Sequence, residues 1–440
     1  MKRPPLDRGI LYFKKGKLDA AAEVFRHYPH DGQAMTFLGA ICNQRKDYHS
    51  AGNFLHRALK IDANNHTAHF MLGTALNGME RTEDARVSFE FAVALKPDHA
   101  FALIQLGRHA EALTALQAMD GRDPAVKVAL AICWQSLNQP DKALEIIGDP
   151  GNDAAANWAR AVALLQIGDF DRGWPAFEWR YQHLNIRTKA SEDADRLWRG
   201  QFDIAGKRVL LYREQGFGDA IQFARFAPML ADRGATVLIE RAPGLDILGT
   251  LRGVTMIENP QPSDLDCHAP FTGLPNALRI GAAVGMLCPY LSADPERVAA
   301  WKARLPPTSR PRIGLAWSGN PRHQNDRNRS MTRAMFNELD TFADVFPVQP
   351  TDDWPLHGFD DTAALMMNLD LIVSVDSAPA HLAGALGLPL IVMLPWAPDW
   401  RWMLDRWDSP WYPTAHLYRQ ETPGDWSSVI TRIIDKAQAV

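Results

Sequence analysis

Residues 371–387 read LIVSVDSAPAHLAGALG, and this stretch decides the fold of the second part of the chain. It opens with Leu371–Val375, an aliphatic run interrupted only by Ser374, which has the length and composition of a buried strand. Polar residues and Pro379 follow, and then small residues and leucines continue at helical spacing. A buried strand that runs directly into a helix is the building unit of parallel α/β sheets.

Further short apolar runs, separated by turns and helical stretches, lie on both sides of this unit. The predicted strands are Arg208–Tyr212, Thr236–Glu240, Val254–Glu258, Arg312–Trp317, Leu371–Val375 and Pro389–Leu394. The proline-rich stretch 305–311 suits neither helix nor strand and predicts a linker. We therefore expect two Rossmann-like domains, residues 195–305 and 306–440, with a ligand site at the carboxyl ends of their strands.

The first polar motif of this part is EQGFGD, residues 214–219, between the strand 208–212 and a helical stretch predicted over 220–230. Its glycines permit a tight turn and the close approach of a ligand to free N–H groups at a helix start. Asp219 is a candidate general base for a bound hydroxyl, and the alternative is that it is simply the N-cap of the helix. The candidate acceptor-side residues here are Gln215, Gly216, Gly218 and Gln222.

The second motif is DSAPAH, residues 376–381, where a helix N-terminus again favours a diphosphate. Asp376 is a candidate to accept a hydrogen bond from a ribose or sugar hydroxyl. Ser377 is a candidate to donate a hydrogen bond to a phosphate, and His381 to donate one to a phosphate or sugar oxygen. The alternative is that Ser377 caps the helix and His381 is a structural histidine.

The third motif joins GLAWSGN, residues 314–320, to NDRNRS, residues 325–330. A strand here ends in a polar loop with two arginines, whose planar guanidinium groups suit phosphate oxygens. Ser318, Asn320 and Arg329 are therefore candidate donor-binding residues, and the alternative is an exposed charged loop without a ligand.

The first part of the chain carries a repeat. Four positions recur 34 residues later, where Gly39, Ala51, Leu55 and Ala58 become Gly73, Ala85, Phe89 and Ala92. This period is typical of tetratricopeptide repeats, in which small residues let the two helices of a pair approach closely. We expect five or six helical pairs, a solenoid domain over residues 1–185. Such solenoids bind a peptide or protein, and the alternative is that these helices only brace the neighbouring domain.

Composition restricts the function further. The 440 residues are 46% hydrophobic and 22% charged, the balance of an ordinary globular protein, and the net charge of −4 argues against nucleic-acid binding. Four scattered cysteines without a CxxC pair argue against a zinc module or a disulfide framework. The chain has neither a signal-type h-region nor the roughly 18 apolar residues of a membrane span, so we expect a cytoplasmic protein.

Two further features are interpreted as structural. Residues 396–426 contain six of the 14 tryptophans, which we expect mainly in the core. The triplet Asp264–Asp266 has the form DxD, but it lies in an apparent strand, and no metal is assigned to it.

These motifs, in this order, resemble bacterial proteins that join tetratricopeptide repeats to a glycosyltransferase of the GT-B fold, related to the heptosyltransferases and more distantly to O-GlcNAc transferase. The stretches that carry the resemblance are Glu214–Gln222, Gly314–Asn320, Asp361–Leu365, Val375–Pro389, Pro398–Trp402 and Asp408–Pro413. It implies that Asp219 is the catalytic base and that Asp376, Ser377 and His381 bind the donor. Ala378 stands where the family usually has glycine, Arg329 is the nearest match to the family's diphosphate lysine, and residues 349–361 are shorter than expected.

The function that we expect is an inverting, metal-independent transfer of a sugar from a nucleotide-sugar donor to an acceptor hydroxyl, with no cofactor. The resemblance extends to flagellin glycosyltransferases, so a cytosolic protein acceptor bound by the helical repeats is expected, with flagellin as one candidate. Two other functions stay open: a non-catalytic repeat scaffold with a degenerate GT-B domain, and a nucleotide-sugar epimerase or hydrolase.

Overall fold

The computed structural model describes residues 5–184, 193–281, 288–321, 323 and 325–439. The chain divides into two compact units, Met1–Gln139 and Pro140–Val440. The domain limits predicted near residues 185, 195 and 305 stay predictions, and the division shows that the helices of the first part of the chain belong to both units.

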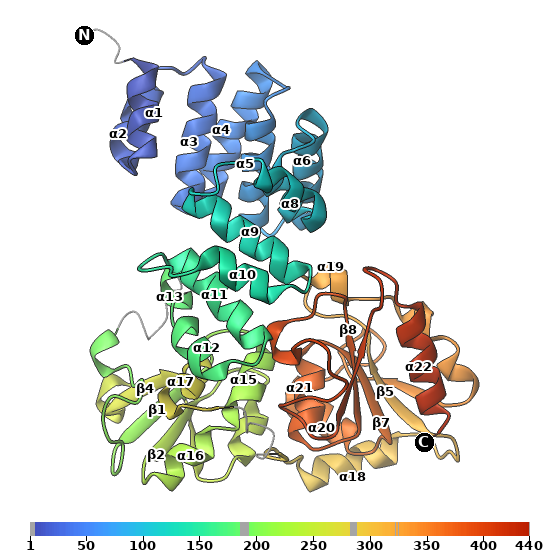
Figure 1. The fold of residues 1–440 in the computed structure, drawn as a ribbon. Helices are drawn as coiled ribbons and strands as arrows, with labels where there is room; N and C mark the ends of the chain where they lie inside the picture. The colour runs from blue at the N-terminus through green and yellow to red at the C-terminus, as the bar shows by residue number, and fades with distance from the viewer. Residues whose placement is uncertain (1–4, 185–192, 282–287, 322, 324, 440) are drawn as a thin grey trace. The chain divides into compact units, whose positions relative to one another are not determined.

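The first unit is built from consecutive antiparallel helix pairs (Figure 1). Its helices are α1 (Leu6–Lys14), α2 (Leu18–Arg26), α3 (Gly32–Gln44), α4 (Tyr48–Ile61), α5 (His66–Gly78), α6 (Thr82–Leu95), α7 (Ala100–Gln105), α8 (His109–Gln117) and α9 (Pro124–Ser136).

Two glycines explain the period of 34. A methyl group on Gly39 would lie 2.5 Å from Leu55 Cγ, and one on Gly73 would lie 2.5 Å from Phe89 Cε1. A side chain at either position would force the two helices of the pair apart, because packed interiors leave no room for an added methyl group.

The second unit begins with four more helices and continues into two separate parallel sheets (Figure 1). The helices are α10 (Pro140–Ile147), α11 (Ala154–Gln166), α12 (Phe170–Phe177) and α13 (Arg180–His183). The first sheet has the order β3-β2-β1-β4, from β1 (Arg208–Tyr212), β2 (Thr236–Glu240), β3 (Val254–Ile257) and β4 (Cys267–Pro270). The second has the order β6-β5-β7-β8-β9, from β5 (Arg312–Ala316), β6 (Asp344–Pro347), β7 (Leu371–Val375), β8 (Leu390–Leu394) and β9 (Ala415–Arg419).

Helices surround these sheets. Those next to the first sheet are α15 (Phe217–Ala224), α16 (Ala227–Asp232) and α17 (Leu274–Leu278), and α18 (Pro295–Arg304) precedes the second. The helices between and after the strands of the second sheet are α19 (Asp326–Arg329), α20 (Gly358–Met366), α21 (Ala378–Ala385) and α22 (Ser427–Ala437). The predicted fold class, a helical repeat region followed by parallel-sheet α/β domains, is confirmed.

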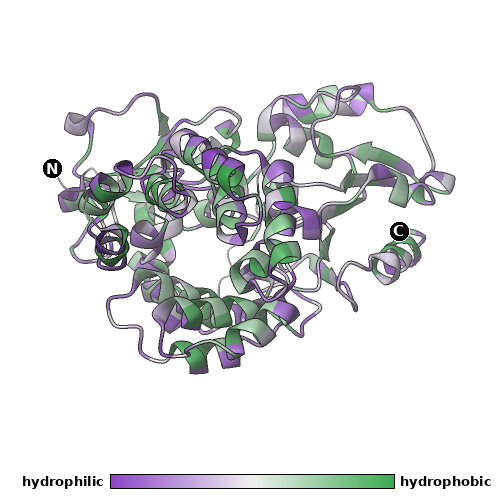
Figure 2. Cartoon of the chain, turned by 90° about the horizontal axis from the view of Figure 1, so that it is seen from above, coloured by the Kyte–Doolittle hydropathy of each residue, from purple (hydrophilic) through white to green (hydrophobic). Residues whose placement is uncertain are grey.

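The central strands β7 and β8 of the second sheet are buried at every position, which explains why they are aliphatic at almost every position. Leu371, Val373 and Val375 of β7 pack into one apolar cluster with α22, whereas Ile372 packs into the cluster on the opposite face. Figure 2 shows hydrophobic residues concentrated in helices and strands and hydrophilic residues along the connecting loops.

All the predicted strands are present, within one residue at each end, but the expectations differ from the structure in three respects. The strands β4, β6 and β9 were not predicted, because β4 and β6 end in proline and β9 is half polar. The helix predicted over 220–230 is two helices separated at Arg225–Phe226, because Pro228 starts α16. The triplet at Asp264 is not in a strand: Pro262–Asp264 form a 3₁₀ turn, and β4 begins only at Cys267.

Most of the C-terminal tryptophans are in the core, as interpreted. Trp400, Trp402, Trp411 and Trp426 are buried, whereas Trp407 is 65% exposed. None of the helices in the described parts of the chain is long and apolar enough to cross a bilayer.

Candidate functional site

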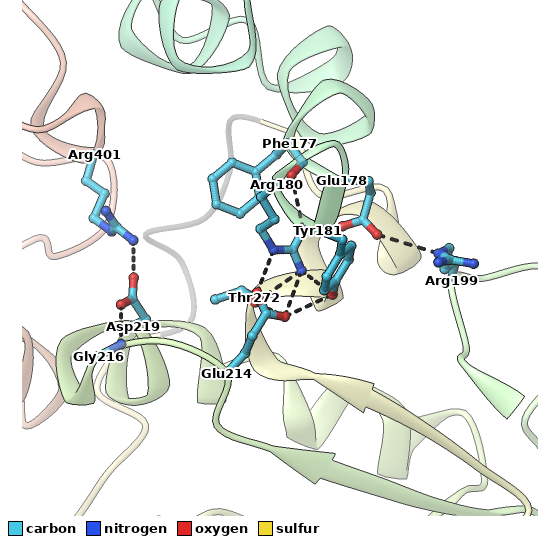
Figure 3. A network of polar contacts seen from close by, with 10 residues as sticks. All are labelled: Phe177, Glu178, Arg180, Tyr181, Arg199, Glu214, Gly216, Asp219, Thr272 and Arg401. Carbon is cyan, nitrogen blue, oxygen red and sulfur yellow. Dashed lines mark hydrogen bonds and ion pairs between the residues drawn. The ribbon is translucent and has the colours of Figure 1, made fainter. Parts of the chain in front are cut away.

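Asp219 lies at the carboxyl end of the first sheet, in the first turn of α15. The N-cap of this helix is Gly216, and Asp219 is its third residue, so the alternative that Asp219 is the N-cap is wrong. The side chain still serves the helix start, because Asp219 Oδ2 accepts the Gly216 N–H at 2.9 Å. The other carboxylate oxygen faces the second sheet domain (Figure 3).

That second oxygen accepts a hydrogen bond from Arg401, which no sequence pattern had singled out as a site residue. Arg401 also donates to Gln222 Oε1 at 2.7 Å and to Asp399 Oδ1 at 2.8 Å. The guanidinium group therefore joins Asp219 and Gln222 of the first sheet domain to Asp399 of the second. One signal in the sequence could have found Arg401, since it belongs to the stretch Pro398–Trp402 that carries the family resemblance.

Burial sets the electrostatics of this pair. The side chains of Arg401 and Asp219 are only 11% and 18% exposed. Burial raises the pKa of Asp219 above the ordinary 3.8, and the neighbouring Arg401 charge partly opposes that rise. A carboxylate with a raised pKa that is still held ionised by a cation is suited to accept a proton.

The DSAPAH motif occupies the corresponding position in the second domain, between β7 and α21. Asp376 is buried, and desolvation together with Asp399 raises its pKa to about 6. Ser377 is the N-cap residue of α21, but its hydroxyl donates to the carbonyl of Val375 at 3.2 Å and makes no side-chain cap.

His381 is a buried residue of α21 with aromatic neighbours. Its Nδ1 lies 2.9 Å from the Tyr412 hydroxyl, and its ring stacks on Trp402 at 5.5 Å between centroids. Burial and the nearby arginines hold the pKa of His381 well below its usual value, so the ring is neutral at physiological pH.

The third motif reaches the second through Arg329. Its Nη1 donates to the carbonyl oxygen of Asp376 at 2.5 Å, and its Nε donates to Asp326 at 3.2 Å. A methyl group on Gly319 would lie 2.7 Å from Arg329 Nη2, which explains the glycine at that position.

Ser318 and Asn320 lie in the loop that follows β5. The Ser318 hydroxyl accepts from Gln349 Nε2 at 2.9 Å, and the side-chain oxygen Oε1 of Gln349 accepts the Ser318 N–H at 3.1 Å. The Asn320 carbonyl accepts the His323 N–H at 2.9 Å and closes a turn. The loop is therefore held by Gln349 and by a hydrogen bond within the loop itself. None of these contacts joins Ser318 to Asp376.

Gly218 is where the first and second motifs meet. A methyl group on Gly218 would lie 2.8 Å from His381 Cδ2 and 3.6 Å from Ala378 Cα. The starts of α15 and α21 therefore touch, and Asp219, the residue after Gly218, lies near the DSAPAH motif of the other domain.

Two amide groups beside Asp219 have hydrogen-bonding capacity to spare. Within the described residues, the buried Nε2 atoms of Gln215 and Gln222 have no hydrogen-bond partner. Both residues belong to the predicted acceptor side, and a buried amide donor without a partner is costly unless a ligand accepts from it.

The local positive charge comes from arginine. Among the residues that the structure describes, no group of three or more His, Cys, Asp or Glu side chains is placed to hold a metal ion. Arg401 and Arg329 instead lie beside Asp219 and Asp376.

Comparison with known proteins gives two family matches. Residues 351–394 match the glycosyltransferase family 9 (heptosyltransferase) family, and residues 6–66 match the tetratricopeptide repeat. The first match contains Asp376, Ser377 and His381, and Asp219 and Arg401 lie outside it. The resemblance identified from the sequence motifs is confirmed by these matches.

Three individual proteins are similar to this chain or to a part of it. The chain is 27% identical to protein FlbA of Caulobacter vibrioides, over 97% of this chain and 77% of that protein. The ADP-heptose lipopolysaccharide heptosyltransferase II of E. coli is similar at 14% identity, over 53% of this chain and 98% of that one, with a TM-score of 0.39. A tetratricopeptide-repeat protein of Thermus thermophilus is similar at 21% identity, over 37% of this chain and 97% of that one, with a TM-score of 0.30.

Proposed function

We propose that this chain, which joins tetratricopeptide repeats to a glycosyltransferase family 9 domain, transfers a sugar from a nucleotide-sugar donor to an acceptor hydroxyl with inversion at the anomeric carbon. The observation that carries the proposal is the contact between Gly218 and His381, which sets Asp219 of one domain beside the donor motif of the other. Two reactants held by two domains meet at such a junction.

Asp219 is the proposed general base. It takes the proton of the acceptor hydroxyl while the hydroxyl oxygen forms a bond to C1 of the sugar. The bond between C1 and the diphosphate oxygen breaks on the opposite face, and its electron pair leaves with the nucleotide diphosphate. Because the carboxylate is mostly buried and its pKa is raised, Asp219 is a stronger base than an exposed aspartate. The buried amides of Gln215 and Gln222 are the donors that orient the acceptor.

The second domain holds the donor. The start of α21 presents free N–H groups to the diphosphate, and Asp376 accepts from a ribose or sugar hydroxyl. Ser377 and His381 donate to phosphate or sugar oxygens, and Ser318 and Asn320 line the donor side of the loop after β5.

Arginine charge takes the place of a metal ion in this proposal. Negative charge builds on the departing diphosphate, and fixed cations in a buried site stabilise it without a divalent ion. Arg329, which donates to the carbonyl of Asp376, is a cation in direct contact with the DSAPAH motif.

The acceptor is proposed to be a protein that the helical repeats select, because such repeats bind peptides and proteins. Flagellin is one candidate. We place the reaction in the cytoplasm, where the four cysteines, which are free thiols in the structure, would stay reduced.

Thermal-shift measurements test the donor half of the proposal. UDP, GDP, ADP, CMP and their sugar conjugates are added with a chelator to the wild type and to Asp376→Ala. A ligand at about 100 times its Kd adds roughly 2.7 kcal/mol to the stability of the protein. A shift with one nucleotide that Asp376→Ala loses supports the donor site. A shift that appears only when a divalent ion replaces the chelator contradicts metal independence. No shift with any nucleotide favours the repeat scaffold.

A further inference from the structure

The helices α12 and α13 precede the first sheet, and Figure 3 shows Arg180 and Tyr181 of α13 in contact with Glu214, at the start of the loop that leads to Asp219. We infer that Arg180 is a positioning residue for the proposed base: through its ion pair with Glu214, it holds the loop that presents Asp219. The inference rests on the proposed function, because it assigns Arg180 a part in that reaction.

The contact between Arg180 and Glu214 is fully buried and has several partners. Arg180 Nε and Nη2 donate to the two Glu214 oxygens at 2.8 and 3.2 Å, and both side chains are 0% exposed. The Tyr181 hydroxyl donates to Glu214 Oε2 at 2.9 Å, and the Thr272 hydroxyl donates to it at 3.3 Å. These hydrogen bonds from Arg180, Tyr181 and Thr272 together fix the position of the Glu214 carboxylate.

Glu214 is the first residue of the motif that ends at Asp219. The chain runs from Glu214 through Gly216, whose N–H is the hydrogen-bond donor to Asp219 Oδ2. If Glu214 shifts, the Gly216 N–H shifts with it, and the hydrogen bond that positions the carboxylate of Asp219 is weakened. The guanidinium of Arg180 thus controls a side chain that it does not touch.

The same helices reach the other member of the Asp219–Arg401 pair through aromatic contacts. The rings of Trp174 and Phe177 lie 5.5 and 6.0 Å from the ring of Trp400, and the guanidinium of Arg401 lies over that ring at 4.4 Å. Phe177 also accepts from Arg180 through its carbonyl oxygen at 3.2 Å. One short segment, residues 174–181, therefore supports both Asp219 and Arg401, which come from different domains.

Stability alone does not explain a buried ion pair here. Taking two charges out of water costs free energy that their attraction often only offsets, and apolar or neutral pairs of similar size are commonly as stable. What the Arg180–Glu214 pair adds is a defined geometry for the loop, because the bonds of a guanidinium fork are directional.

The test uses the full chain and the double variant Arg180→Met/Glu214→Gln, which removes both charges of the pair together. Glu178, which also pairs with Arg180 at 2.7 Å, is 17% exposed and keeps its ion pair with Arg199 at 3.7 Å. We measure its Tm, the amide hydrogen exchange of residues 213–219, the Kd of the nucleotide found in the thermal-shift panel, and kcat. The matched control is Arg252→Met/Asp232→Asn, which removes an exposed bidentate pair, at 2.7 Å, on the same domain.

We expect the double variant to keep its Tm and nucleotide Kd, to exchange residues 213–219 faster than the wild type, and to lose kcat by about 10²-fold, the cost of a small misplacement of a catalytic group. The control stays at wild-type values throughout. Wild-type exchange and kcat in the double variant would overturn the inference. If the wild type itself transfers no sugar, the proposed function fails, and the exchange of residues 213–219 still decides whether Arg180 holds the loop.

Discussion

Gly218 and His381 lie in contact, with the start of α15 in the first sheet domain set against α21 of the second. An added methyl group on Gly218 would stand 2.8 Å from His381 Cδ2, closer than carbon atoms approach without displacement. This contact brings the two polar motifs next to each other.

Gly218→Ala is expected to separate the two motifs. Alanine is normally favoured in a helix over glycine, but here the overpacking costs about 1–3 kcal/mol and displaces His381. Stability to urea and donor binding should both be weakened. Gly121→Ala is the control, because a methyl group there has no atom within 4 Å. Equal stability of the two variants would show that the contact is loose.

Asp219→Asn is expected to reduce kcat by roughly 10²–10⁴-fold, the usual contribution of a general base. Nucleotide Kd should stay unchanged, because the proposed donor site lies in the second domain. In the wild type, burial raises the pKa of Asp219, and the base works only when ionised, so the rate falls as pH falls through a pKa above 3.8. Turnover by Asp219→Asn at the wild-type rate would remove Asp219 from the mechanism.

Arg401→Gln is expected to move the acid limb of the pH–rate profile to higher pH. The positive charge of Arg401 lowers the pKa of Asp219, so its removal lets burial raise that pKa further. The comparison variant is Arg406→Gln, which loses an ion pair with Asp408, at 2.7 Å, in the same loop. If the two profiles coincide, the charge of Arg401 does not tune the base.

Asp376→Asn is expected to stabilise the protein at neutral pH. The folded-state pKa of Asp376, about 6, lies above its ordinary value of 3.8, so the folded state binds the proton more tightly than the unfolded state does. The free energy of unfolding of the wild type therefore falls as pH rises from about 4 to 6, on the order of 1–3 kcal/mol. Asparagine does not titrate, so the difference between the variant and the wild type should vanish below pH 4. A constant difference across this range would contradict the raised pKa.

Local patterns allowed much of the fold to be predicted. One run of 17 residues predicts both the strand β7 and the start of the helix that follows it. The period of 34 is visible because Gly39 and Gly73 each face a large side chain on the second helix of the same helix pair. The strands with proline or polar residues were missed, because their pairing comes from neighbouring strands rather than from composition. Within the site, Asp219 and Asp376 were found because each follows a buried strand.

Neither Arg401 nor Arg180 directly follows a buried strand, and only the family resemblance of Pro398–Trp402 pointed toward Arg401. Arg401 lies 182 residues from Asp219 along the chain, and Arg180 lies 34 residues from Glu214. The sequence around an arginine does not show whether the side chain is exposed to water or buried against a carboxylate. Its partner is fixed only when elements distant in the sequence pack together.

Periodicity and composition act over neighbouring residues, and they were enough to predict the helical repeats, the parallel sheets and the two polar motifs at strand ends. The tertiary structure alone decided that these motifs meet at Gly218, that Arg401 pairs with Asp219, and that Arg180 fixes Glu214. The physical reason is that the energy of a buried charge depends on its surroundings in three dimensions, and the chain supplies those surroundings from positions far apart.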